Sequence, residues 1–84
     1  MIRLALVLPC YNEEEILPLS AKKLDALFKD LLEREKISKD SFVLFVNDGS
    51  KDATWDVIAQ LHNEYPFAKG LNLAHNVVHQ SAIF

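Results

Sequence analysis

Short apolar runs alternate along this chain with longer amphipathic segments. Residues 2–8 and 42–46 are apolar runs, and polar, turn-forming residues follow each of them. The run at 42–46 is rich in β-branched and aromatic residues and lacks strict alternation, which is typical of a strand buried on both faces of a parallel sheet. We therefore predict strands over 2–8 and 42–46, and a third over 68–73.

A first amphipathic helix is predicted after residue 11. Asn12 and Glu15 fit a capping box, with Asn12 as the N-cap. Pro18 is compatible with this helix only if its regular part begins late. Apolar residues then recur at helical spacing, and these form the stripe expected to face the core: Leu24, Leu27, Phe28, Leu31 and Leu32.

Two further helices are predicted. One starts between Ser50 and Asp52, which are both acceptable caps, and runs to about Glu64 before Pro66 stops it. Another starts after the polar turn at 74–76 and covers residues 77–84.

The resulting order, β-α-β-α-β-α with short links, implies a parallel sheet. We predict an α/β fold, a three-layer α/β/α arrangement that forms half of a doubly wound, Rossmann-like sheet. One edge of this sheet is left open where a fourth strand would pair. An open apolar edge favours self-association, so we expect a homo-oligomer.

Length and composition narrow the function classes. Eighty-four residues make one small domain. A net charge of −3 does not indicate the excess of basic residues that is typical of nucleic-acid-binding domains. The single cysteine excludes an internal disulfide and suits a reducing, cytoplasmic compartment. The chain ends on an apolar Ile-Phe pair without a helix cap, from which we expect an amino-terminal segment of something longer.

Carboxylates follow two of the predicted strands. Asp48 lies two residues past the end of 42–46, and Glu13 lies in the polar segment after 2–8. Ligands of open α/β sheets bind at the carboxyl ends of strands. Asp48 could accept the imide N–H of uracil or the N1–H of guanine, and Glu13 could accept ribose hydroxyls. Tyr11 offers a ring to pack on a base, and Pro9 fixes a backbone carbonyl beside it.

Simpler structural roles compete with these assignments. Asp48 could form an Asx turn or cap a helix, and Glu13 could only complement a helix dipole. The glycine-rich dinucleotide fingerprint and the P-loop are both missing from the chain. His75 and His79 lack a third ligand at zinc-like spacing, and Cys10 is interpreted as a packing thiol.

Three motifs together resemble a known family. Residues 9–14 (Pro-Cys-Tyr-Asn-Glu-Glu), 46–54 (Val-Asn-Asp-Gly-Ser-Lys-Asp-Ala-Thr) and 76–80 (Asn-Val-Val-His-Gln) are similar to the opening motifs of family 2 glycosyltransferases. The closest branch is that of the polyprenyl-phosphate glycosyltransferases, which include dolichol-phosphate mannose synthases. The resemblance spans the whole chain.

The resemblance implies an A-type glycosyltransferase fold whose amino-terminal half binds a sugar nucleotide. Pro9, Tyr11 and Glu13 would line the base and ribose pocket, Asp48 would read the base, and Asn76 and Gln80 would approach the sugar nucleotide. The parent enzyme would move a hexose from a UDP- or GDP-sugar to a polyprenyl phosphate, at the cytoplasmic face of a membrane. Its divalent metal, Mg²⁺ or Mn²⁺, would bind an Asp-x-Asp motif beyond this chain. The catalytic carboxylate would also lie beyond this chain.

Two departures from the family pattern and two competing classes accompany this assignment. Asn47 replaces the usual first aspartate, with little expected loss, and Val78 stands where the branch usually has glycine.

The competing classes are a non-catalytic α/β binding or assembly module and a receiver-like phosphoacceptor domain. The receiver-like class is weakened because its acid pair should follow the first strand, where this chain has Pro9, Cys10 and Tyr11.

Overall fold

The computed structural model describes residues 2–73 and 81–83. Strands and helices alternate along most of this chain. Their order is β1 (Ala5–Cys10), α1 (Leu17–Glu33), β2 (Phe42–Asp48), α2 (Thr54–Glu64), β3 (Ala68–Leu73) and β4 (Ser81–Ile83).

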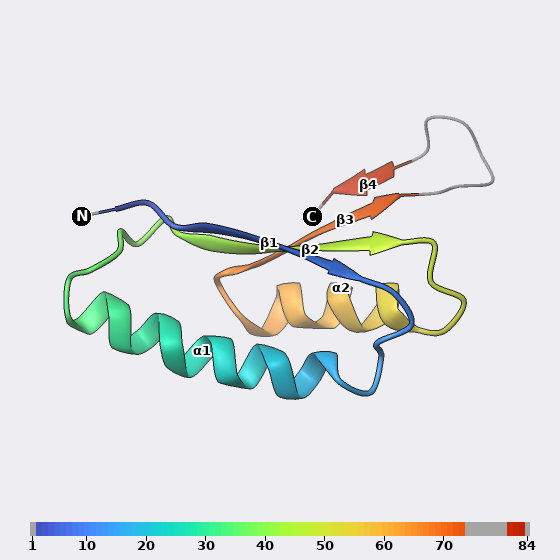
Figure 1. The fold of residues 1–84 in the computed structure, drawn as a ribbon, viewed down its shortest axis with the longest axis horizontal. Helices are drawn as coiled ribbons and strands as arrows, with labels where there is room; N and C mark the ends of the chain where they lie inside the picture. The colour runs from blue at the N-terminus through green and yellow to red at the C-terminus, as the bar shows by residue number, and fades with distance from the viewer. Residues whose placement is uncertain (1, 74–80, 84) are drawn as a thin grey trace.

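The strands form one sheet in the order β1-β2-β3-β4. β1 and β3 both pair in parallel with β2, whereas β4 runs antiparallel to β3. Both helices lie on the same side of this sheet (Figure 1). The predicted α/β class with a parallel sheet is confirmed, and the described residues build two of the three expected layers.

The core lies between the sheet and the two helices. Phe45, Val43 and Ile58 are fully buried there, and Phe28 of α1 stacks against Phe67 with ring centroids 5.0 Å apart. Burying these side chains is the main source of stability, at roughly 1.5–3 kcal/mol for each large apolar side chain.

The buried stripe of α1 differs from the predicted one. Leu17 and Ala21 are buried together with Phe28, while Leu27 and Leu32 are exposed to solvent. The predicted stripe begins at Leu24, about two turns after Leu17, where the buried stripe begins. The α1 face that meets the sheet is therefore rotated relative to the predicted face.

The start of α1 also corrects the sequence analysis. The N-cap residue is Ile16, and Pro18 lies in the first turn, so the regular helix does begin late. The predicted capping box is wrong because Asn12 has a φ of 51° and lies in a turn well before the helix. A left-handed conformation suits asparagine, whose short polar side chain tolerates it.

The bounds of the other elements differ from the predicted bounds by a few residues. The first strand is Ala5–Cys10 instead of 2–8, because Ile2 forms only an isolated bridge with Ile37. The second strand extends to Asp48, and α2 starts at Thr54 instead of within 50–52. The end of α2 at Glu64 and the third strand, Ala68–Leu73, are confirmed.

The carboxyl-terminal region departs furthest from expectation. Residues 81–83 form β4 beside β3 instead of continuing a helix, and residues 77–80 and 84 of that predicted helix lie outside the described residues. The sheet edge expected to be open next to β3 is thus covered by the chain itself, through three antiparallel residue pairs.

Among the residues that the structure describes, no helix covers one face of the sheet. Along β2 the side chains of Val43, Phe45 and Asn47 are buried, whereas those between them are only partly buried. The prediction that this strand is buried on both faces is therefore wrong for the described residues. Figure 1 shows the uncovered face above the sheet, opposite α1 and α2.

Candidate functional site

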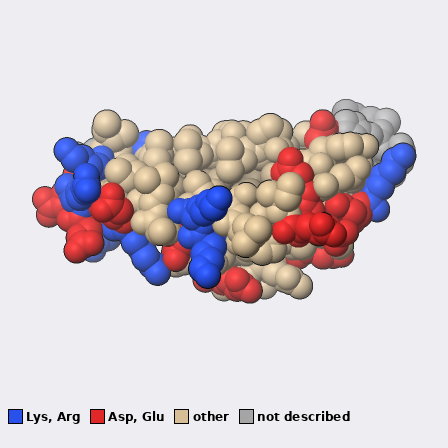
Figure 2. Space-filling model, turned by 60° about the horizontal axis from the view of Figure 1, so that its bottom comes forward, with Lys and Arg blue, Asp and Glu red and all other residues tan. Residues whose placement is uncertain are grey.

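Two loops meet at the carboxyl ends of β1 and β2. Because these strands are parallel and in register up to Cys10 and Asn47, residues 11–16 and 49–53 leave the sheet at the same edge. The two polar segments that the sequence analysis singled out are therefore neighbours in space. Figure 2 views the helix side and shows acidic side chains gathered at this end of the molecule.

Hydrogen bonds join the two loops at Asn12. Its backbone N–H donates to Ser50 Oγ at 2.9 Å, and its side-chain Oδ1 accepts from the backbone N–H of Lys51 at 2.8 Å. Asn12 has a left-handed φ of 51°, and both its backbone N–H and its side chain bond to the second loop. Asn12 is thus a connector between the loops and not a helix cap.

A second junction runs through Thr54. The Glu13 backbone N–H donates to Thr54 Oγ1 at 2.8 Å, and the Thr54 hydroxyl in turn donates to Asp52 Oδ1. Thr54 is completely buried, so its hydroxyl has no water to replace either partner. This chain of donors and acceptors fixes the backbone position of Glu13.

Asp52 collects the remaining hydrogen bonds of this junction. Its carboxylate also accepts from the backbone N–H of Thr54 at 2.9 Å and from that of Glu14 at 3.4 Å. The hydrogen bond from the Thr54 hydroxyl, helped by these N–H groups, holds the pKa of the Asp52 carboxyl below its usual range. The ionised carboxylate is therefore the form that fits the folded loops.

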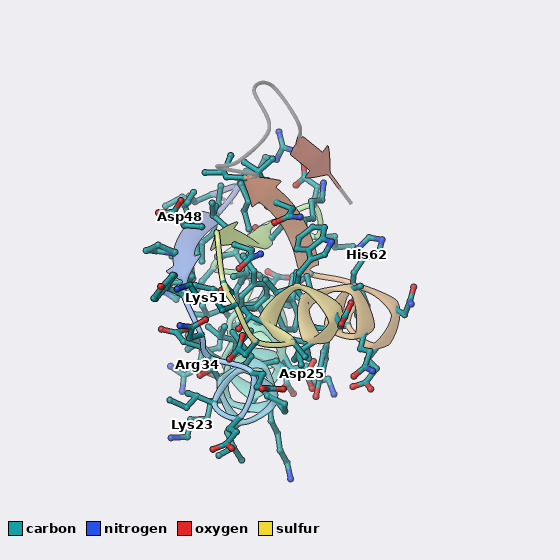
Figure 3. All side chains as sticks on the ribbon, turned by 90° about the vertical axis from the view of Figure 1, so that its right-hand side faces the viewer. Lys23, Asp25, Arg34, Asp48, Lys51 and His62 are labelled. Atoms are coloured by element: carbon teal, nitrogen blue, oxygen red, sulfur yellow. The ribbon has the colours of Figure 1, made fainter. Side chains whose placement is uncertain are left out.

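The predicted site residues occupy two regions of this edge. Pro9 is an exposed residue of β1 that pairs with Val46, and Asp48 follows two residues later on the same face of β2. Tyr11 comes next in the first loop and is also exposed. Figure 3 looks onto this end of the sheet and labels Asp48 at the end of β2.

Glu13 lines a separate hollow that is formed mainly by the first loop. A polar hollow of about 230 Å³ is lined by a run of the first loop and one residue of the second: Asn12, Glu13, Glu14, Glu15, Ile16 and Asp52. Asp48 is not part of this lining. A nucleoside that touched both carboxylates would therefore have to extend across the turn at Tyr11 and Asn12. The last two predicted residues, Asn76 and Gln80, lie outside the described residues.

Asn47 forms a buried amide pair at the same edge. Its Nδ2 donates to Asn72 Oδ1 at 2.8 Å, and the residue is only 4% exposed. An amide needs no counter-ion, whereas a carboxylate buried here would carry a desolvation cost. The asparagine at this position therefore links β2 to β3 without placing a charge in the core.

Cys10 is buried against this edge and has a packing role, as predicted. Burial raises the pKa of its thiol to about 11, and the nearby Glu13 carboxylate acts in the same direction. The thiolate is the reactive form of cysteine, so this thiol is a poor nucleophile at neutral pH.

The carboxylates at this end of the molecule do not form a metal site. No group of three or more His, Cys, Asp or Glu side chains within 2–73 is arranged to hold a metal ion. The acidic hollow does not qualify because its Asp52 carboxylate is already occupied by three hydrogen-bond donors. The described residues do not fit the divalent metal that the resemblance implies.

Sequence reasoning missed the residues that hold the loops together. From the sequence, Ser50 and Asp52 are interpreted as possible caps, Thr54 as part of a motif and Asn12 as a helix N-cap. The spacing of hydroxyl and carboxyl groups over 50–54 was visible. Their partners lie 38 to 41 residues away in sequence, so only the fold identifies them.

The fold is that of a Rossmann-like α/β domain with a parallel sheet, and comparison with known proteins identifies its family. The family model described as "Glycosyl transferase family 2" matches residues 5–83. The chain therefore belongs to glycosyl transferase family 2, as the motifs predicted.

Named relatives cover almost the whole chain. It is 45% identical over 80 residues to the "Uncharacterized glycosyltransferase YkoT" of Bacillus subtilis (95% of this chain, 24% of the relative). It is 42% identical over 85 residues to the "Dolichyl-phosphate beta-glucosyltransferase ALG5A" of Trichomonas vaginalis (98% and 25%). It is 33% identical over 84 residues to the "Prophage bactoprenol glucosyl transferase homolog" of Escherichia coli (99% and 25%).

The chain is much shorter than these relatives. It spans about a quarter of the length of the curated relatives that it matches. Two of the relatives carry names from the branch that the motifs resemble. Neither helix in the described part of the chain is long and apolar enough to span a membrane.

Proposed function

We propose that this chain supplies the base-and-ribose part of the donor pocket of a hexosyltransferase. The observation that carries the proposal is the junction between residues 11–16 and 49–53, which holds two family motifs together at the carboxyl edge of a parallel sheet. This is the edge at which open α/β sheets bind ligands. We take residues 1–84 as the amino-terminal part of the glycosyltransferase domain.

The donor is proposed to be a UDP- or GDP-hexose. Asp48 accepts an N–H of the base, Tyr11 packs its ring on the base, and Pro9 directs the backbone beside them. Glu13 accepts hydrogen bonds from the ribose hydroxyls across the turn at Asn12. The exposure of Tyr11 and Asp48 supports these roles, because both side chains are accessible to a ligand.

The acceptor is proposed to be a polyprenyl phosphate, at the cytoplasmic face of a membrane. The support comes from relatives named as dolichyl-phosphate and bactoprenol glucosyltransferases. Chemically, an acceptor phosphate is already ionised at neutral pH and needs little help from a general base. We assign no catalytic residue within 1–84, and the divalent metal of the parent enzyme is assigned to residues outside them.

Nucleotide titration tests this proposal. We expect UDP or GDP to bind with a Kd on the order of 1 mM or tighter. In NMR spectra the shifts should centre on Tyr11, Glu13 and Asp48, and Asp48→Ala should abolish them. The matched control is Glu64→Ala, which removes one exposed carboxylate at the opposite end of α2.

The outcomes are distinct. Binding that survives Asp48→Ala, or that Glu64→Ala weakens equally, would contradict the assigned pocket. Flat titrations with both nucleotides, from a chain shown to be folded, would favour a non-catalytic α/β binding module instead.

A further inference from the structure

Lys51 is the only basic residue in the two segments that meet at the carboxyl edge of the sheet, 11–16 and 48–53. Five residues of these segments carry carboxylates: Glu13, Glu14, Glu15, Asp48 and Asp52. A nucleotide diphosphate is strongly negative at neutral pH, so these carboxylates repel it. A ligand of this kind therefore needs a cation at this edge, and Lys51 is the one that the two segments supply.

Hydrogen bonds hold the backbone of Lys51 next to the proposed nucleoside contacts. The Lys51 N–H donates to Asn12 Oδ1 at 2.8 Å, and the Asn12 N–H donates to Ser50 Oγ at 2.9 Å. Asn12 in turn lies between Tyr11, the proposed base contact, and Glu13, the proposed ribose contact. The Lys51 side chain therefore starts beside the turn that a bound nucleoside would cross.

The side chain of Lys51 is accessible to a ligand. It is exposed and forms no ion pair with the residues that the structure describes. The neighbouring carboxylate of Asp52 already accepts hydrogen bonds from the Thr54 hydroxyl and from the backbone N–H groups of Thr54 and Glu14. Figure 3 looks onto this end of the molecule and labels Lys51 in the loop that follows Asp48.

We propose that Lys51 binds the diphosphate of the sugar-nucleotide donor. This inference rests on the proposed function, because the ribose that Glu13 contacts sets where the phosphates lie. The 5′-phosphates are one sugar ring away from the 2′- and 3′-hydroxyls, and the flexible four-carbon stem of lysine carries its ammonium over such a distance. The ammonium donates charge-assisted hydrogen bonds to the phosphate oxygens. Lys51 thus favours the diphosphate over the free nucleoside, which Asp48 and Tyr11 do not distinguish.

NMR titration with matched nucleosides and nucleotides tests the proposal. Uridine and UDP, or guanosine and GDP, are titrated into the folded chain with EDTA present, so that divalent cations do not bridge the phosphates. The diphosphate should bind more tightly than its nucleoside. Lys51→Gln should weaken binding of the diphosphate about three- to tenfold and leave the affinity for the nucleoside unchanged. Lys51→Arg keeps the charge and should retain most of the affinity for the diphosphate.

Lys39→Gln is the matched control. Lys39 is also exposed, but it precedes β2 and so lies at the opposite end of that strand from Lys51. The control removes the same charge and should change neither affinity. Salt provides a second measurement, because raising NaCl from about 50 to 300 mM screens the attraction between lysine and phosphate. Binding of the diphosphate should therefore weaken more for the wild type than for Lys51→Gln. Circular dichroism of each variant verifies folding.

Three results would overturn this assignment and leave the nucleoside pocket in place. These are equal affinities of the wild type for nucleoside and diphosphate, a Lys51→Gln variant that binds the diphosphate as tightly as the wild type, and equal weakening by Lys51→Gln and Lys39→Gln. Weakening of nucleoside and diphosphate alike in Lys51→Gln would also overturn it, because Lys51 would then act on the shape of the loops. A folded wild-type chain that binds neither ligand would contradict the proposed function itself, and the inference with it.

Discussion

The backbone N–H of Glu13 donates a hydrogen bond to the buried hydroxyl of Thr54, 41 residues further along the chain. This bond ties the loop after β1 to the first residue of α2. The position of Glu13, a proposed ribose contact, therefore depends on a threonine that itself has no access to solvent.

Removing that hydroxyl should loosen the first loop. Thr54→Val keeps the shape of the side chain but leaves the Glu13 N–H without an acceptor, which should lower the free energy of unfolding by about 1–3 kcal/mol. Urea denaturation measures this change. Thr54→Ser keeps the hydroxyl and should be less destabilising, and a serine variant as unstable as the valine variant would contradict the role of the hydrogen bond.

Asp52 should make the loop junction sensitive to acid. Its pKa is lowered in the folded chain, so its contribution to stability is present above the unfolded value of about 4 and is lost as the pH falls through the folded value. Denaturation midpoints of wild type and Asp52→Asn should therefore differ most near neutral pH and converge below about pH 4. A difference that stays constant across this range would show that the ionised carboxylate is not what stabilises the loops.

Cys10 should be unreactive while the chain is folded. A pKa of about 11 leaves very little thiolate at neutral pH, and the thiol is also shielded from solvent. Iodoacetamide should label it slowly under native conditions and rapidly in urea, as followed by mass spectrometry. Because the folded pKa is raised, stability should also fall as the pH rises above about 8.5, the ordinary value for cysteine. Rapid native labelling would place this thiol at an accessible position.

The 84-residue chain by itself should not transfer sugar. We assign to it only contacts to the donor nucleotide, with neither a metal site nor a catalytic carboxylate. Incubation with a UDP- or GDP-hexose and a polyprenyl phosphate should leave the lipid unmodified, as measured by mass spectrometry. Hexose transfer by the isolated chain would show that catalytic groups lie within residues 1–84.

The sequence predicted the elements well where local patterns decide them. The apolar run at 42–46 identified β2, and Pro66 placed the end of α2 at about Glu64, where it lies. The start of α1 was predicted incorrectly because the capping-box pattern of Asn12 and Glu15 is local, whereas the partners of Asn12 are Ser50 and Lys51. A long-range contact outweighed the local preference there.

By itself, the sequence determined the fold class, the family and the two polar segments at the strand ends, because these follow from periodicity, turn residues and motif order. Only the tertiary structure decided how those segments join, through Asn12, Asp52 and Thr54, and that Glu13 lines a different hollow from Asp48. It also decided that both helices lie on one face of the sheet and that residues 81–83 pair with its β3 edge. The physical reason is that hydrogen bonds and packing between distant residues depend on register and direction, which a linear pattern does not contain.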